Sequence, residues 1–159
     1  MARWETFSAF LDDAQRAPEA ERAALVDALL AERPSFPWVE GEQATFVYRG
    51  EVNSVALNLD VLPGDPPFAP LLRLEGTDFW YHTRTFLADD LLDYLLAVDD
   101  PGTPLAGDRD LLQRVADHWR PDPLNPLRLT TPQQSVSILR MDQARPVPDW
   151  SAFASVPRG

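Results

Sequence analysis

Cysteine is absent from the 159-residue chain, and glycine is scarce, with only 7 residues. Without cysteine the chain has neither disulfide bonds nor thiolate metal sites, which fits a reducing compartment such as the cytoplasm. No apolar run approaches the ~20 residues that a membrane-spanning helix needs. The N-terminus lacks a basic segment followed by an apolar run, so no secretory signal is predicted either.

Basic residues are also few, with 14 Lys and Arg against 25 Asp and Glu, for a net charge of -11. An acidic surface repels nucleic acid and anionic lipid, so neither is expected as a general partner. At this length a single domain is the default, and a chain that is 45% hydrophobic can fill a core. The 16 prolines favour rigid loops over long helices.

Two short helices are predicted at the start of the chain. Apolar residues recur at spacings of three and four between residues 4 and 14. A second helix begins near Pro18, carries the apolar stripe Leu25, Ala28 and Leu29, and ends at Pro34. Because two short helices cannot bury their stripes alone, this hairpin must dock. It is either a lid on a sheet or a cap over a site or an interface with another domain.

From Phe36 onward the apolar residues alternate with period two, which is typical of β-strands. Strands are expected at residues 43–49, 53–61 (with Val61 facing inward), 71–75, 78–86, 92–98 and 134–140. The stretch 71–99 is predicted to be an antiparallel meander. A short helix is possible at 108–118, with Leu111, Leu112 and Val115 on one side.

These elements predict a mainly β protein, a β-sandwich with an N-terminal helical hairpin. The expected organisation is a hairpin at residues 1–34 packed on the sandwich, the sandwich itself at 35–145, and an extended exit segment at 146–159.

Four sequence stretches resemble the N-terminal domain of enterochelin esterases, cytoplasmic enzymes that hydrolyse ferric catecholate-siderophore triesters. They are Ala-Thr-Phe-Val-Tyr-Arg-Gly at 44–50, Arg-Leu-Glu-Gly-Thr-Asp-Phe-Trp-Tyr at 73–81, Asp-Pro-Leu-Asn-Pro at 122–126 and Ser-Val-Ser-Ile-Leu at 135–139. The resemblance implies an immunoglobulin-like fold of the early-set type. It also implies that the expected partner in cis is a C-terminal α/β-hydrolase domain, toward which the segment 146–159 would lead.

No catalytic residue is predicted in the chain itself. The family's chemistry lies in the hydrolase domain, whose Gly-x-Ser-x-Gly turn exposes the serine oxygen, and none of the serines here has that setting. His82 and His118 are expected to be structural or surface residues. The acidic clusters lack the spacing of a calcium loop, so no metal and no cofactor is predicted. Iron would arrive already wrapped in its siderophore.

Four residues are candidates for binding the anionic siderophore. Arg84 is placed on the outward face of its strand by alternation with Trp80 and His82. Trp119 and Arg120 put an aromatic ring beside a guanidinium group, which suits a flat catecholate. Asn125 belongs to the Asp-Pro-Leu-Asn-Pro run, which is more plausibly structural, although such a loop could form an edge of a neighbouring active site.

Two other functions stay open. The first is a carbohydrate-binding or glucan-associated module of immunoglobulin-like fold, although the region 58–63 has no aromatic residue before Phe68 to form a sugar platform. The second is a non-catalytic interaction domain. An apolar patch left exposed without the hydrolase domain could also drive formation of a homodimer.

Overall fold

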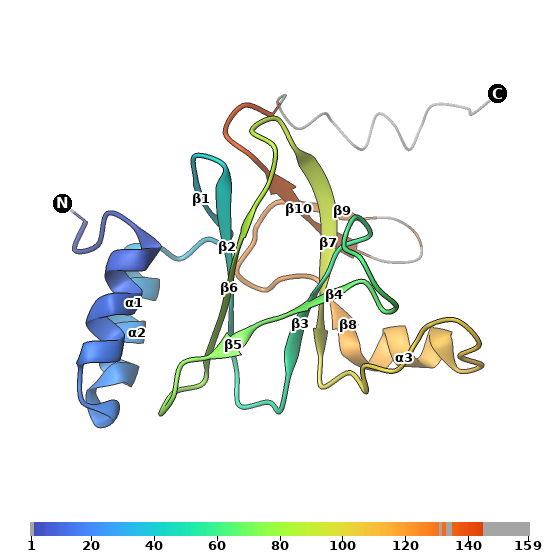
Figure 1. Ribbon diagram of the computed structural model, residues 1–159, viewed down its shortest axis with the longest axis horizontal. Coiled ribbons are helices and arrows are strands. Elements are labelled where there is room, and N and C mark those ends of the chain that lie inside the picture. The colour runs from blue at the N-terminus through green and yellow to red at the C-terminus, as the bar shows by residue number, and fades with distance from the viewer. Residues whose placement is uncertain (1, 131, 133–134, 145–159) are drawn as a thin grey trace.

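The computed structural model describes residues 2–130, 132 and 135–144, which form three layers (Figure 1). A pair of helices covers one side of a first sheet, and a second sheet covers its other side. The predicted segment 146–159 lies outside the described residues. None of the described helices is long and apolar enough to span a bilayer.

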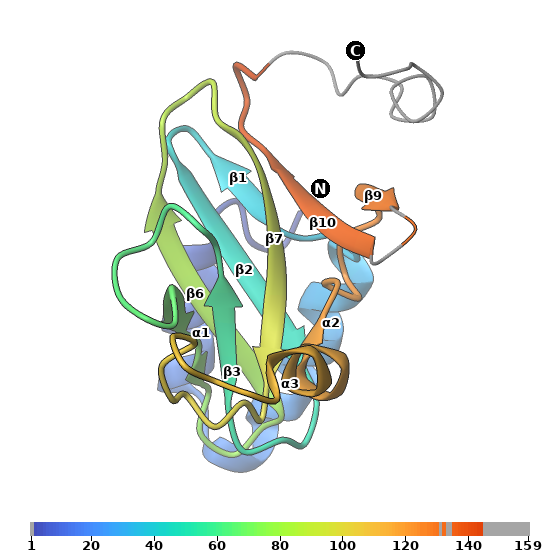
Figure 2. The same ribbon diagram turned by 90° about the vertical axis from the view of Figure 1, so that its right-hand side faces the viewer.

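The two sheets are antiparallel. The first has the order β1-β2-β6-β5, with β1 at Trp38–Glu40, β2 at Gln43–Arg49, β5 at Leu72–Arg73 and β6 at Phe79–Thr85. The second has the order β4-β3-β7-β10-β9, and β8 also pairs with β7. Figure 2 shows β3, β7 and β10 of this sheet side by side. Its strands are β3 at Val55–Asn58, β4 at Phe68–Pro70, β7 at Leu91–Val98, β8 at Trp119–Arg120, β9 at Arg128–Thr130 and β10 at Ser135–Arg140. The mainly β, two-sheet architecture is confirmed, while the immunoglobulin-like assignment stays a prediction.

Strand β2 shows why the first sheet is buried on both faces. Its alternation sends Ala44, Phe46 and Tyr48 into the core between the sheets. Val47 points the other way, into the core beneath the helices, and is fully buried there.

The helices are α1 at Phe7–Arg16 and α2 at Arg22–Glu32, joined through a 3-10 turn at Glu19–Glu21. Helix α1 begins where the Thr6 hydroxyl accepts a hydrogen bond from the Ala9 amide at 3.1 Å. Its buried residues Phe7, Phe10 and Ala14 have the predicted spacing. In α2 the buried residues are Val26 and Leu29, so the predicted stripe is displaced toward Val26.

The predicted meander is wrong. Strands β5 and β6 do form a hairpin, but β7 lies in the second sheet, between β3 and β10. Both edges of β6 are already occupied, by β2 and in part by β5. The chain therefore crosses between the sheets after Phe86, and β7 brings its apolar residues to the second sheet.

The inward-facing prediction for Val61 fails, and the predicted apolar side of the helix near residues 108–118 is not its buried side. Val61 is 66% exposed, because the chain turns after β3 and the Leu62 amide donates to the Leu59 carbonyl at 2.9 Å. Leu62 is buried instead. Helix α3 spans Leu111–His118, yet Leu112 is 89% exposed and the buried residue of this helix is Arg114.

Candidate functional site

Asn125 is buried in a polar cluster where the Asp-Pro-Leu-Asn-Pro loop crosses the second sheet. Its side-chain amide donates to the Tyr94 hydroxyl at 3.0 Å and to the Ile138 carbonyl at 2.9 Å. Its side-chain oxygen accepts from the Leu127 amide at 2.8 Å. With its side chain occupied in this way, Asn125 holds the loop to β7 and β10.

Asp122 completes this cluster and is fully buried. Its carboxylate accepts hydrogen bonds from the Tyr94 hydroxyl and the Leu124 amide, at 2.8 and 2.9 Å. Burial raises the pKa of Asp122 to about 6, although these hydrogen bonds and the charge of Arg128 act in the opposite direction. The Leu124 carbonyl in turn accepts from the Phe36 amide at 2.9 Å. The cluster therefore also fixes the segment that leads from α2 to β1.

Trp119 and Arg120 do not form a joint clamp. In the register of β8 with β7, Trp119 lies opposite Ala97 and Arg120 opposite Leu96, so the two side chains project to opposite faces of the second sheet. The Trp119 indole donates to Asp100 at 2.8 Å. Arg120 is exposed, and its guanidinium group approaches only the Asp117 carbonyl, at 3.4 Å.

Asp100 is engaged by Arg114 rather than left free for a ligand. The guanidinium group of Arg114 donates twice to the Asp100 carboxylate, at 2.6 and 2.9 Å, and once to Asp108 at 3.0 Å. Burial raises the pKa of Asp100, but the hydrogen bonds from Arg114, the Gly102 amide and Trp119, together with the charge of Arg114, lower it below its ordinary value. This network joins α3 to the end of β7, so Trp119 is held as part of a structural anchor.

Arg84 lies on β6, but not on an outward face. Trp80 and Phe86 belong to the core between the sheets, and both are an even number of residues away from Arg84. The pairing of β6 with β2 is continuous from residue 79 to 85, so alternation places Arg84 on the same face of the strand. Arg84 therefore points to the inter-sheet side, where it is half-buried opposite Ala44. The four predicted binding residues thus lie on different faces and do not meet in one site, and their role in binding stays a prediction.

The two histidines have different surroundings. His118 donates through Nδ1 to the Val98 carbonyl at 2.9 Å, as a structural histidine would. His82 is half-buried on the same face of β6 as Arg84, and its Nε2 atom is enclosed without a hydrogen-bond partner in the described part of the chain. Burial, and next the charge of Arg84, lower the pKa of His82, so its ring is neutral at pH 7.

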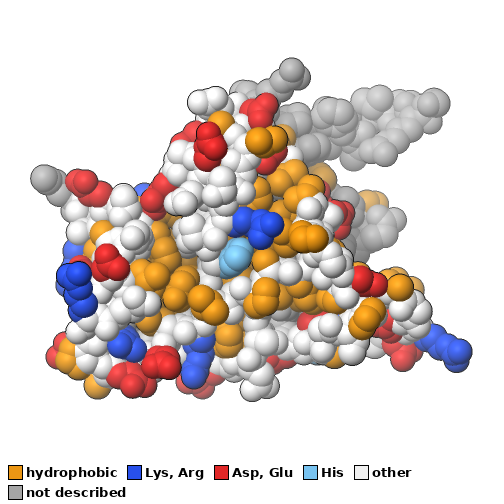
Figure 3. Space-filling view, in the orientation of Figure 1, with side chains coloured by type: hydrophobic (Ala, Val, Ile, Leu, Met, Phe, Trp, Pro, Cys, Tyr) orange, Lys and Arg blue, Asp and Glu red, His pale blue; other side chains and the backbone are white. Residues whose placement is uncertain are grey.

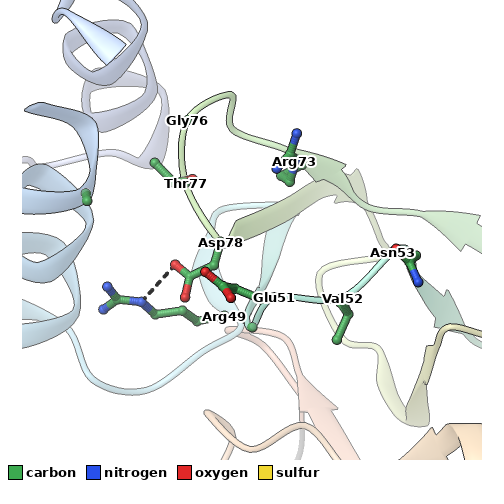
Figure 4. Close-up of a pocket in the computed structure, with 10 residues that line it drawn as sticks. Arg49, Glu51, Val52, Asn53, Arg73, Gly76, Thr77 and Asp78 are labelled. Atoms are coloured by element: carbon green, nitrogen blue, oxygen red, sulfur yellow. Dashed lines mark hydrogen bonds and ion pairs between the residues drawn. The ribbon is translucent and has the colours of Figure 1, made fainter. Parts of the chain in front are cut away.

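A cavity of about 620 Å³ lies where the connection from β2 to β3 and the turn between β5 and β6 approach α2 (Figure 4). One wall carries Arg49, which pairs with Asp27 of α2 at 2.6 Å and with Asp78 at 3.2 Å. Arg73 stands across the cavity from this pair. Since the ion pairs tie the helices to the first sheet, this wall is structural. Sequence reasoning missed the cavity because it depends on the packing of α2 against turns that are distant in the chain.

Within residues 2–130, 132 and 135–144, no group of three or more His, Asp or Glu side chains is arranged to hold a metal ion. No described histidine is bonded to a serine hydroxyl either; His118 is bonded to a carbonyl and His82 Nε2 has no partner.

Comparison with known proteins identifies relatives that are much longer than this chain. A family model described as the N-terminal domain of enterochelin esterase matches residues 43–150. No curated protein matches significantly. The solved ferric enterobactin esterase of Salmonella typhimurium is 20% identical with a TM-score of 0.56, and the match covers 79% of this chain and 38% of that one. The solved enterochelin esterase of Shigella flexneri is 22% identical with a TM-score of 0.51, and the match covers 72% of this chain and 34% of that one. The chain thus spans about a third of the length of these solved esterases, and at such identities the likeness shows the fold alone.

Proposed function

We propose, because this chain belongs to the family of enterochelin esterase N-terminal domains, that it is the accessory domain of an enterochelin esterase-like serine hydrolase. In this proposal it helps to form the cleft for a ferric catecholate siderophore ester, and a C-terminal α/β-hydrolase domain in cis supplies the nucleophile. The process served is iron release in the cytoplasm. The observation that carries the proposal is the family match over residues 43–150.

The contacts of the described residues are consistent with a role that shapes a cleft rather than one that performs chemistry. The polar cluster of Tyr94, Asp122 and Asn125 is saturated with internal hydrogen bonds, so it fixes a loop and has no free group to offer a substrate. Arg84 differs, because this half-buried residue makes no hydrogen bond or ion pair among the described residues. The direct substrate contact that we propose is therefore Arg84, with Asn125 acting through the loop that it holds.

The test is hydrolysis of ferric enterobactin, followed by chromatography of the released catechol acids. The isolated 159-residue chain is expected to release no more than a mock preparation purified from cells that lack its gene. The reading frame after Gly159 is expected to encode a Gly-x-Ser-x-Gly turn within a βα pattern, and the protein it encodes should hydrolyse the ester. Hydrolysis by the isolated chain, or a downstream frame without such a turn, would contradict the proposal.

A second candidate function, binding of a neutral sugar, is favoured by a groove on the outer face of the second sheet. Pro70, Ala56, Ala97 and Trp119 are successive cross-strand partners there, so they form one row on this face. Phe68 meets Trp119 edge-on at a ring-centroid distance of 5.8 Å. The adjoining cavity of about 320 Å³ is large enough for a pyranose ring to lie against these apolar groups.

Titration with maltoheptaose while tryptophan fluorescence is recorded separates the two functions. Saturable quenching that disappears in Trp119→Leu would support the sugar-binding module. Fluorescence that stays unchanged at millimolar sugar would exclude it and leave the accessory domain.

A further inference from the structure

The cavity of about 620 Å³ next to α2 has walls that are fixed by contacts between segments distant in the chain. The Gly50 amide donates to the Asp78 carbonyl at 2.9 Å, and the Gly50 carbonyl accepts from the Trp80 indole at 3.1 Å. Together with the ion pairs of Arg49, these contacts hold the connection from β2 to β3 against the turn between β5 and β6. The cavity is therefore formed before any ligand arrives.

Three polar side chains in the lining of this cavity take no part in these contacts. They are Glu51, Asn53 and Arg73. Within the described residues, none of these three side chains makes a hydrogen bond or an ion pair, whereas Arg49 and Asp78 in the same lining are paired with each other. The fixed walls thus leave one carboxylate, one amide and one cation available to a ligand.

The two available charges are of opposite sign and lie on opposite sides of the cavity. Figure 4 shows Glu51 next to Arg49 and Asp78, with Arg73 on the other side. Because Arg73 and Glu51 form no ion pair with each other, neither charge is neutralised across the cavity. A ligand that lies between them can engage both only if it carries an anionic and a cationic group.

The surface around the cavity is of mixed charge, although the chain as a whole is acidic. Figure 3 shows acidic and basic side chains next to one another at the lower edge of the molecule, where the turn between β5 and β6 lies beside the helical hairpin. With a net charge of -11 the chain repels a simple anion, and a simple cation would face the like charge of Arg73. A ligand that carries both charges meets neither penalty.

The rest of the lining leaves room for a short aliphatic group. Ala23 of α2 and Gly76 contribute little or no side chain, and Val52 is half-buried against the core between the sheets. None of the described residues that line the cavity is aromatic, so no ring is offered for stacking. This composition favours an aliphatic ligand over an aromatic one.

We infer that this cavity binds a small aliphatic zwitterion of the amino-acid class, with its carboxylate accepting from Arg73 and its ammonium group donating to Glu51. A guanidinium group matches a carboxylate through two parallel hydrogen bonds, and the Asn53 amide can donate to one end of the ligand or accept from the other. The site is separate from the proposed siderophore contact, because Arg84 is not among the lining residues. It also needs no hydrolase domain, since all of its groups belong to this chain.

The test uses L-leucine as the probe, with two closely related compounds that each lack one of its charges. N-acetyl-L-leucine keeps only the carboxylate, and L-leucinamide keeps only the ammonium group, which is protonated at pH 6. Amide signals of residues 50–53 and 73–78 are followed by NMR in the 159-residue chain during titration. L-Leucine is expected to shift these signals saturably, and both related compounds are expected to bind at least tenfold more weakly. Equal binding of L-leucine and either compound, or no saturable shift at these residues, would overturn the inference.

Variants then assign the two charges. Arg73→Gln and Glu51→Gln should each weaken L-leucine binding at least tenfold, and both residues are exposed, so the fold should be retained. Arg109→Gln and Glu75→Gln, at exposed positions that do not line the cavity, are the matched controls and should leave binding unchanged. Arg73→Gln should also abolish the preference for L-leucine over L-leucinamide, and Glu51→Gln should reduce the preference over N-acetyl-L-leucine. Equal losses in the variants and their controls would show that only net charge matters and would refute the site.

Discussion

Asp122 is a fully buried carboxyl group whose pKa is raised to about 6 by burial. Because the folded-state pKa lies above the ordinary 3.8, the folded state binds this proton more tightly than the unfolded state does. The stabilising contribution is therefore complete below about pH 4 and is lost as the pH rises through 6. Two pKa units correspond to about 3 kcal/mol.

The prediction is that Asp122→Asn, which cannot ionise, removes this part of the pH dependence. Unfolding in urea at pH 4, 5, 6 and 7 should show the free-energy difference between wild type and variant changing in favour of the variant as the pH rises. The lost hydrogen bonds lower the whole curve of the variant, but they do not change its slope. Parallel curves for the two proteins would show that Asp122 titrates normally.

Arg114 anchors α3 through its buried double hydrogen bond to Asp100. Arg114→Ala would leave the Asp100 carboxylate buried without its cation, a change that typically costs 3–5 kcal/mol. Arg109→Ala, an exposed substitution next to the same helix, should change the stability by less than about 0.5 kcal/mol. Urea unfolding of both variants measures the difference, and similar losses for the two would mean that the Asp100 pair contributes no net stability.

At the scale of elements, the turn between β5 and β6 is one of the places where the helical hairpin contacts the first sheet. Gly76 has a φ of +81°, and a Cβ atom there would collide with Cγ of Glu19. Nearby, Arg22 donates to the Glu75 carbonyl at 3.1 Å. This glycine is therefore required both for its backbone conformation and for the close approach of the hairpin.

Gly76→Ala should be more destabilising than Gly107→Ala, which has nearly the same φ of +80° but open space around its Cβ position. Both substitutions carry the cost of a left-handed alanine, about 1 kcal/mol, so the difference between them measures the collision. Adding Glu19→Ala should restore most of the difference, as measured by thermal unfolding. If Glu19→Ala restores nothing, the collision is relieved in some other way and the hairpin is not tightly seated there.

Periodicity predicted the helices and most strands, because alternation and helical spacing are local properties. It could not predict neighbours: β6 and β7 follow each other in the chain yet lie in different sheets, since pairing depends on which edges are already occupied. Periodicity also failed in α3, where Arg114 is buried and Leu112 is exposed. Arg114 is buried because it pairs with the Asp100 carboxylate, a contact that helical spacing does not reveal.

The candidate site was less predictable than the fold. Trp119 and Arg120 are adjacent in sequence, and that adjacency is what sends them to opposite faces once they form a strand. His82 and Arg84 could have been paired from the sequence by their spacing of two. That they are only half-buried, whereas Trp80 and Phe86 on the same face are buried, could not be read from this spacing.

For the whole molecule, the three layers place the first sheet in the centre, with helices over part of one face and the second sheet over the other. Phe79 is fully buried beneath the helices, and its ring stacks on Phe7 at 6.3 Å between centroids. Val47 on β2 and Leu74 next to β5 lie in the same core. The helices thus cover an apolar sheet face that a monomeric protein would not leave exposed.

Deleting residues 1–34 should therefore uncover this face and convert the chain into a self-associated or loosely packed state. The expected result is loss of near-ultraviolet circular dichroism and earlier elution in size-exclusion chromatography. Phe10→Ala, which leaves the hairpin in place but removes a fully buried ring, serves as the matched control. It should cost about 3–5 kcal/mol while keeping one cooperative transition. A deleted chain that stayed monomeric and unfolded cooperatively would show that the two sheets are self-sufficient, and the hairpin would then be free to act as a cap over a neighbouring domain.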